Sequence, residues 1–280
     1  MTHLSHSSLP SLRTVIETYG LAAKKSLGQH FLLDMNITRA IVKHAALTDQ
    51  THVIEIGPGP GGLTRALLET NIASCVAIER DKRCVAALAE ITDKRLSVIE
   101  GDALKINPQT LTPCPRAIAA NLPYNIGTQL LLNWLPHAHH FESMTLMFQK
   151  EVADRLLAKP NTKDYGRLTL MAQFFCRMQR VMNLPASVFW PPPKIDSTVV
   201  RLIPRADKPS DIDFTLFEAL TKAAFGQRRK MLRTTLKNFG GESLLEKANI
   251  LPQSRAEDLS LEDFERLVCL KRKEERGERK

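Results

Sequence analysis

Cysteine is scarce in this chain of 280 residues. The five cysteines are widely separated along the sequence: Cys75, Cys84, Cys114, Cys176 and Cys269. Their number is odd and no Cys-x-x-Cys pair occurs, which argues against both a disulfide framework and a zinc knuckle. This cysteine usage fits a reducing compartment, and we expect the protein to work in the cytoplasm.

Long hydrophobic runs are absent too. No apolar stretch approaches the roughly 20 residues of a membrane-spanning helix, and the first 25 residues lack the hydrophobic core of a secretory signal. The composition is that of a globular protein, with 43% hydrophobic and 25% charged residues. We therefore expect a soluble protein without a membrane partner, long enough for one large and one smaller domain.

Clustered metal ligands are also missing. His137, His139 and His140 are close in sequence, but they share no fixed helical face with carboxylates or thiols and they follow a proline. We interpret them as part of an exposed loop and expect no metal site. The basic side chains outnumber the acidic ones by 39 to 30, and the resulting net charge of +9 favours a polyanionic partner without identifying it.

Short apolar runs alternate with helical segments along the first two thirds of the chain. This alternation predicts βαβ units and a parallel sheet, and hence an α/β fold. The expected strands are 53–56, 74–78, 96–99, 117–120 and 144–148, followed by two closing strands at 181–183 and 198–202. Beyond residue 204 the pattern is helical, so we expect a catalytic domain over 1–204 and a helical domain over 205–280.

A glycine-rich segment follows the first expected strand. Gly57, Gly59 and Gly62 have the G-x-G-x-x-G spacing of nucleotide-binding turns, in which glycine lets the backbone turn tightly and approach a ligand. This spacing alone cannot choose a cofactor, because it is shared by several nucleotide-binding sheets. We expect Gly57 and Gly59 to line a cofactor pocket.

Two acids follow the next two strands. Glu79 ends the second strand, where a carboxylate can accept hydrogen bonds from both ribose hydroxyls of an adenosine moiety. Asp102 follows the third strand and could accept a bond from an adenine amino group, an acid that dinucleotide folds do not require. The pair therefore favours S-adenosylmethionine over NAD. The alternative is that both acids only cap the following helices.

The fourth strand ends in Asn121-Leu-Pro-Tyr124. The Asn121 side-chain oxygen and the Leu122 carbonyl could accept hydrogen bonds from an adenine N6 and localise its lone pair toward a methyl donor. Pro123 would hold the backbone, and Tyr124 would stack on a base taken out of its helix. The alternative is an ordinary turn after a strand.

Several further segments, spread over most of the chain, combine with these motifs into one recognisable pattern. With them the sequence resembles the ribosomal RNA adenine N6-dimethyltransferase family, and within it the bacterial enzymes that act on small-subunit rRNA. The matching segments are Gly28-Gln-His-Phe-Leu32, Glu55 to Gly62, Ile78-Glu79-Arg80, Gly101-Asp102, Asn121 to Tyr124, Gln149 to Arg155 and Phe189-x-Pro-Pro-Pro-Lys-Ile-Asp-Ser197. The resemblance implies a Rossmann-like class I methyltransferase sheet with a smaller all-α C-terminal domain.

The resemblance also implies roles for single residues. His30 and Leu32 would touch the methionine end of S-adenosylmethionine, Gly57 its backbone, Glu79 its ribose, Asp102 its adenine, and Asn121 both cofactor and target. Phe189 would pack against the flipped adenine opposite Tyr124. The family often has Asn where His30 stands, so a backbone contact is implied there rather than a side-chain one.

The implied activity is dimethylation at N6 of two adjacent adenosines in the 3′-terminal hairpin of small-subunit (16S) rRNA within the 30S particle, as part of ribosome biogenesis. We expect a monomer. The range 222–237 contains six basic residues and no acid, and we expect a helix that binds rRNA phosphates, although a solvated helix face is the alternative. The candidate RNA-binding residues are Arg228, Arg229, Lys230 and Arg233.

Two other functions fit parts of the pattern. A large-subunit rRNA adenine methylase that gives antibiotic resistance would share the pocket, but the Pro-Pro-Pro-Lys-Ile-Asp-Ser run and the long helical C-terminus resemble the small-subunit enzymes more. A non-catalytic ribosome-assembly or transcription-accessory factor would keep the fold and the RNA-binding residues. Such a binder would not need Asn121, Pro123, Tyr124, Glu79 and Asp102 together.

Overall fold

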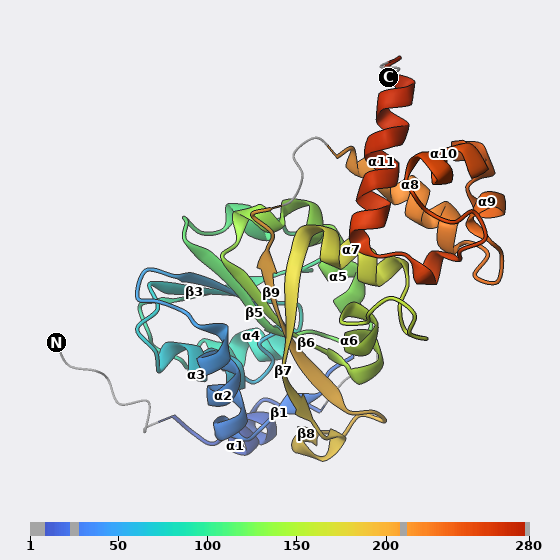
Figure 1. Cartoon of the computed structure of the whole chain (residues 1–280). Coiled ribbons are helices and arrows are strands. Elements are labelled where there is room, and N and C mark those ends of the chain that lie inside the picture. The colour runs from blue at the N-terminus through green and yellow to red at the C-terminus, as the bar shows by residue number, and fades with distance from the viewer. Residues whose placement is uncertain (1–8, 23–27, 208–211, 278–280) are drawn as a thin grey trace. The chain divides into compact units, whose positions relative to one another are not determined.

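A seven-stranded sheet with the strand order β4-β3-β2-β5-β6-β9-β7 forms the centre of the larger part of the protein (Figure 1). This computed structural model describes residues 9–22, 28–207 and 212–277. The strands are β2 (His52–Ile56), β3 (Ser74–Glu79), β4 (Leu96–Glu100), β5 (Arg116–Asn121), β6 (Ser143–Gln149), β7 (Cys176–Leu184) and β9 (Ser197–Pro204). The five strands from β4 to β6 are parallel, and β9 pairs with β6 in the antiparallel sense. The predicted α/β fold is confirmed.

The central strands are the ones that the apolar runs predicted. From Val53 to Ile56 every residue of β2 is buried, and in β5 the four residues 117–120 are buried as well. A parallel strand covered on both faces needs apolar side chains in both directions, which explains the continuous runs in the sequence. Helix α3 (Gly62–Leu68) then returns the chain to β3, and α4 (Lys82–Leu88) returns it to β4.

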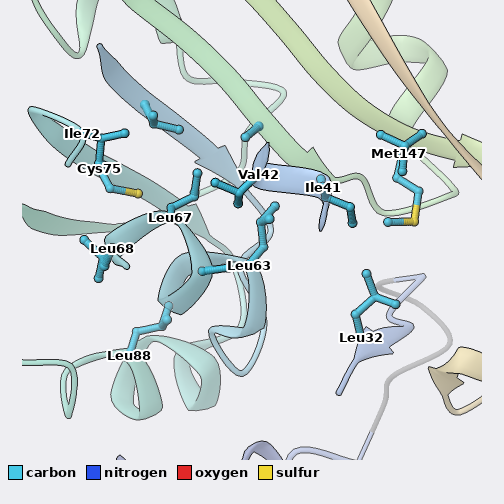
Figure 2. Close-up of a cluster of buried hydrophobic side chains, with 14 of the residues drawn as sticks. Leu32, Ile41, Val42, Leu63, Leu67, Leu68, Ile72, Cys75, Leu88 and Met147 are labelled. Carbon is cyan, nitrogen blue, oxygen red and sulfur yellow. The ribbon is translucent and has the colours of Figure 1, made fainter. Parts of the chain in front are cut away.

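Helices α2 (Met35–Ala45), α3 and α4 contribute to a hydrophobic cluster with one side of the sheet (Figure 2). Asp34 caps α2 by accepting a hydrogen bond from the Asn36 amide at 2.8 Å. Each buried aliphatic side chain of this kind stabilises the fold by about 1.5–3 kcal/mol. The labelled members include Ile41, Val42, Leu63, Leu67, Leu68 and Leu88, with Leu32 and Met147 at its far side.

A second, very small sheet joins two distant segments of the larger unit. Strand β1 (Phe31–Leu32) pairs with β8 (Phe189–Trp190), so that Phe31 faces Trp190 and Leu32 faces Phe189. The proline-rich segment after β8 has neither helix nor strand, as its prolines predicted. The remaining elements of this part are α1 (Leu12–Thr18), α5 (Gly127–Trp134), α6 (Lys150–Leu156), η3 (Pro108–Thr110), η4 (Leu135–His140) and η5 (Ala186–Val188).

The chain divides into two units, Met1–Ala153 with Arg177–Pro204 and Asp154–Cys176 with Arg205–Lys280. The smaller unit has no strand in the described residues beyond Pro204. Its core contains packed aromatic rings, with Phe174 and Phe217 at a centroid distance of 4.4 Å and their planes tilted by 31°. Its helices are α7 (Arg167–Phe175), α8 (Phe214–Phe225), α9 (Leu232–Thr235), α10 (Gly241–Lys247) and α11 (Leu261–Glu275), with η6 (Lys237–Phe239) and η7 (Ala256–Asp258) between them.

Two sequence-based expectations differ from this arrangement. Residues 154–176 group with the C-terminal helices, because Phe174 of α7 packs on Phe217 of α8, whereas the sequence suggested a single cut near residue 205. The basic segment 222–237 is not one helix: α8 ends at Phe225, a turn follows, and α9 begins at Leu232. Gly226 disfavours continuation, and the turn lets Leu232 be buried.

Candidate active site

An open pocket lies at the carboxyl ends of β2, β3, β4 and β5. In parallel sheets this edge, at the point where the strand order reverses, is where ligands bind. The predicted residues that line the pocket are His30, Leu32, Gly57, Gly59, Glu79, Asp102, Asn121, Leu122, Pro123 and Tyr124.

The glycine turn is the floor of this pocket. Gly57 and Gly59 have φ angles of +66° and +57°, in the left-handed region that favours glycine. A β-carbon added at Gly59 would lie 2.8 Å from the Phe31 ring, so a side chain there would displace this ring. The Gly59 amide donates a hydrogen bond to Glu79 Oε2 at 3.0 Å, which ties the turn to the neighbouring strand.

Glu79 is held in one orientation by backbone amides. Its Oε1 accepts hydrogen bonds from the amides of Arg80 at 2.7 Å and Asp81 at 2.8 Å, in addition to the Gly59 bond at Oε2. Burial raises the pKa of the Glu79 carboxyl, and the three amide bonds oppose this rise. The cap of α4 is Asp81, whose side chain accepts from the Arg83 amide. Glu79 is therefore not the helix cap that was the alternative.

Asp102 lies across the pocket edge from Glu79. Its Oδ1 accepts a hydrogen bond from the Leu104 amide at 3.0 Å and thereby holds a turn, and no α-helix follows it directly. The second oxygen, Oδ2, lies 3.6 Å from the Arg80 guanidinium. Sequence reasoning did not assign Arg80 to the site, although its position beside Glu79 was the available signal.

The Asn121 side chain is oriented by a hydrogen bond to the N-terminal part of the pocket. Its amide nitrogen donates to the His30 carbonyl at 3.0 Å, so the side-chain oxygen is left as an acceptor. The Pro123 carbonyl accepts bonds from the amides of Ile126 and Gly127, and α5 begins there. The segment is thus a turn after a strand, and the same turn carries Asn121 into the pocket.

Tyr124 and His30 form a stacked pair. Their ring centroids are 5.2 Å apart and their planes differ by 27°. His30 Nδ1 is hydrogen-bonded to the Pro191 carbonyl at 2.7 Å, and the Tyr124 hydroxyl is hydrogen-bonded to the Ser197 hydroxyl. Burial raises the pKa of the Tyr124 phenol, with the Ser197 bond acting in the opposite direction, so the ring stays neutral at physiological pH. Sequence reasoning missed the parts played by Pro191 and Ser197.

Phe189 is not brought to the pocket surface. Its side chain is 3% exposed and belongs to the hydrophobic cluster that includes Leu32 and Met147. It does not line the pocket in which Tyr124 lies. Packing of Phe189 against the flipped adenine stays a prediction.

Glu55 is a buried acid that the sequence analysis left without a role. It is 1% exposed, lines the pocket, and accepts a hydrogen bond from the Thr64 hydroxyl at 2.6 Å. Burial raises the pKa of its carboxyl to about 8, so this carboxyl is mainly neutral at pH 7. The signal in the sequence was an acid inside an otherwise apolar strand.

The basic residues of the smaller unit fall into two kinds. Arg228 donates to the Lys163 carbonyl at 2.5 Å and forms an ion pair with Glu257 at 3.1 Å, so its guanidinium is engaged within its own unit. The other three candidates, Arg229, Lys230 and Arg233, are exposed.

Neither a metal site nor a membrane span is evident in the described ranges. No group of three or more His, Cys, Asp or Glu side chains is arranged there to hold a metal ion. His137, His139 and His140 are exposed as predicted, but on the 3₁₀ helix η4 rather than in an irregular loop. Among the helices of these ranges, none is both long and apolar enough to cross a membrane.

Curated proteins with similar sequences have a common name. The ribosomal RNA small subunit methyltransferase A of Agrobacterium fabrum is 52% identical over 271 residues, which cover 94% of this chain and 98% of that protein. The protein of the same name from Paramagnetospirillum magneticum is 51% identical over 262 residues, which cover 92% and 93% of the two chains.

Solved structures show the same fold. A dimethyladenosine transferase from Plasmodium falciparum superimposes with a TM-score of 0.77 at 29% identity, covering 89% of this chain and 98% of the other. The 23S rRNA methyltransferase ErmE gives a TM-score of 0.66 at 26% identity, covering 86% and 98%. The family model for ribosomal RNA adenine dimethylases matches residues 20–273. Together with the pocket, these matches show that the chain belongs to the ribosomal RNA adenine dimethylase family.

Proposed function

We propose that this protein transfers methyl groups from S-adenosylmethionine to N6 of two adjacent adenosines in the 3′-terminal hairpin of small-subunit rRNA. Its substrate would be the rRNA within a 30S particle in the cytoplasm, and the reaction would be a step of ribosome biogenesis. The names of the relatives support this assignment. The observation that carries it is the Asn121 side chain, whose nitrogen is bound by the His30 carbonyl while its oxygen is left to accept a hydrogen bond in the pocket.

The pocket residues fit S-adenosylmethionine. Glu79 presents a carboxylate fixed by three amides, and the acceptor position left on Oε2 suits a ribose hydroxyl. Asp102 provides a second acceptor for the adenine amino group, and Gly57 and Gly59 present backbone without a side chain to the pocket. When bound, the cofactor supplies an electrophilic methyl group on a sulfonium.

The target adenine needs help because its N6 lone pair is delocalised into the ring. Asn121 Oδ1 and the Leu122 carbonyl would accept the two N6–H bonds and favour a geometry in which the lone pair points toward the methyl group. Tyr124 would stack on the base, which must leave its helix to reach the pocket. A general base is not needed if the proton leaves to water after transfer.

Two transfers to one adenosine are compatible with these acceptors. After the first methyl group is added, one N6–H remains, and a single acceptor is enough to orient it. The aromatic stack on Tyr124 is unchanged by the added methyl group. The end product would therefore be dimethyladenosine.

The smaller unit would hold the RNA through its phosphates. Arg229, Lys230 and Arg233 are exposed in a stretch without acids, which suits contacts that release counterions. Arg228 would act indirectly, by fixing the turn that carries its neighbours, because its guanidinium is bound to Glu257 and to the Lys163 carbonyl. We expect one copy of the chain to be sufficient.

The two other functions receive less support. A large-subunit methylase would share the fold, but the structural match to ErmE is weaker than the match to the dimethyladenosine transferase. A binder without activity has no use for an Asn121 side chain oriented in a pocket that also contains Glu79 and Asp102.

Labelled methyl transfer tests the proposal. The purified protein, S-adenosylmethionine and small subunits that lack the modification should give labelled dimethyladenosine in the small-subunit rRNA, identified by nucleoside analysis. Large subunits serve as the matched control and should stay unlabelled. Labelling of large subunits instead, or of neither, would contradict the proposed function.

A further inference from the structure

The loop 189–197, which we call the proline loop, exposes two large hydrophobic side chains. Trp190 and Ile195 are both 42% exposed, whereas the neighbouring Phe189 is 3% exposed. The other large hydrophobic residues that are exposed in the described ranges, Leu104, Ile203, Met231 and Leu251, are far apart in the sequence. Tryptophan is enriched at interfaces, because its indole ring combines a large apolar area with a polar N–H group. Lys194 lies between Trp190 and Ile195 and is exposed as well.

The small sheet pairs Trp190, which does not itself line the active-site pocket, with a residue that does. Trp190 is directly opposite Phe31, and cross-strand partners project to the same side of a sheet. Phe31 lines the pocket beside Gly59. The next residue after Trp190, Pro191, accepts the hydrogen bond from the His30 ring that stacks on Tyr124. Trp190 is therefore next in the sequence to the residue that fixes the His30 ring against Tyr124, the ring on which the target base would stack.

The proline loop is held in place at its C-terminal end. Asp196 accepts hydrogen bonds from two separate segments, from the Ala186 amide at its side chain and from the Lys150 amide at its carbonyl, both at 2.9 Å. Ser197 is bound to the Tyr124 hydroxyl. The three prolines within the loop further restrict its backbone. A side chain on such a loop binds with a small entropic cost, because little freedom is left to lose.

We propose that Trp190 is a stacking platform for the unpaired nucleotide next to the adenosine in the active site, with Lys194 beside its phosphate. This inference rests on the proposed function. When one adenosine leaves its helix, the neighbouring base loses a stacking partner, and an indole face near the pocket replaces it. In a pair of adjacent adenosines, one would occupy the pocket while the other stacks on Trp190.

The test compares two replacements in methyl transfer to unmethylated small subunits. Trp190→Leu keeps an apolar side chain but removes the aromatic face. The variant should lower kcat/KM by about 5- to 160-fold, the factor that one stacked base contributes. Most of this loss should appear as a higher KM. Trp190→Phe keeps an aromatic face and should restore most of the loss. Ile203→Ala is the control. It changes an exposed hydrophobic residue on a different strand, β9, and its kcat/KM should equal that of the wild type.

A second measurement does not depend on a substitution. Ultraviolet irradiation of the wild-type protein bound to small subunits should give a zero-length cross-link between rRNA and the peptide that contains Trp190, identified by mass spectrometry. Wild-type kinetics for Trp190→Leu, or equal losses for the leucine and phenylalanine variants, would overturn the inference while leaving the proposed function intact. Unchanged S-adenosylmethionine affinity shows that the variants are folded. Absence of methyl transfer by the wild type would instead overturn the proposed function.

Discussion

Replacement of Asp102 by asparagine tests the cofactor assignment at a single atom. The asparagine oxygen can keep the hydrogen bond from the Leu104 amide at 3.0 Å, so the turn is preserved. The second oxygen, which lies 3.6 Å from the Arg80 guanidinium and would face the adenine amino group, becomes an NH₂ donor. Loss of a charge-assisted hydrogen bond costs about 1.5–3 kcal/mol, so the Kd of S-adenosylhomocysteine should rise by about 10- to 150-fold.

An altered ligand should show the opposite change in affinity. In S-inosylhomocysteine a carbonyl oxygen replaces the adenine amino group, and it would be repelled by the Asp102 carboxylate. The amide of the Asp102→Asn variant could donate to that carbonyl, so the variant should bind the inosine compound more tightly than the wild type does. Isothermal titration calorimetry with both ligands and both proteins measures this reversal, and neither ligand is turned over.

Glu100→Gln is the matched control for this experiment. Glu100 ends the same strand two residues earlier, lies 3.5 Å from Lys82 at the surface, and does not line the pocket. Its replacement should leave both affinities unchanged. If Asp102→Asn binds both ligands as the wild type does, Asp102 does not recognise the adenine and the reasoning is refuted.

Two further predictions concern stability and RNA binding. The pKa of Glu55 is raised to about 8 by burial, so the folded state holds this proton more tightly than the unfolded state, and the stability it contributes at low pH is lost as pH rises from about 5 to about 8. Glu55→Gln should therefore be more stable than the wild type at pH 9, by at most about 5 kcal/mol, with little difference at pH 5. Urea titrations at both pH values measure this, and an equal difference at both would contradict it. Replacement of Arg229 and Lys230 by alanine should reduce the slope of log K for subunit binding against log salt concentration by about 2. Arg228→Ala should instead lower the melting temperature of the protein, because it removes the ion pair with Glu257. An unaltered salt slope would make Arg229 and Lys230 an ordinary solvated surface.

The sequence was sufficient to predict the central sheet and the position of the pocket. Strands β2 and β5 are buried on both faces, so their sequences are continuous apolar runs that are easy to recognise. The residues after such strands meet at one edge because parallel strands share a direction. Glu79, Asp102 and Asn121 could therefore be grouped before any contact between them was known.

The outer strand was harder to predict. We expected strand structure only over 181–183, but β7 extends from Cys176 to Leu184. Arg177, Gln179 and Arg180 are exposed on this edge strand, so its first half has no apolar pattern. Helix α7 also leads directly into strand β7, without a glycine or proline between the helix and the strand. Local pattern reasoning has no signal for such a boundary.

The contacts that complete the site depend on pairings between distant segments. Strands β1 and β8 have two residues each, too few for any periodicity, and they pair only because the tertiary fold brings them together. The bond between His30 and Pro191 spans 161 positions, and the bond between Tyr124 and Ser197 spans 73. Neither could be inferred from spacing, although the segments that contain all four residues had been recognised individually.

Methyl transfer by Asn121→Ala measured against the wild type is the most direct test of the central claim. Because Asn121 would orient N6 in the transition state while phosphate contacts hold the RNA, the variant should lose nearly all transfer to unmethylated small subunits and still bind them. Nucleoside mass spectrometry should show dimethyladenosine with the wild type and almost none with the variant at equal subunit occupancy. Dimethyladenosine formed by Asn121→Ala at the wild-type rate would contradict the account.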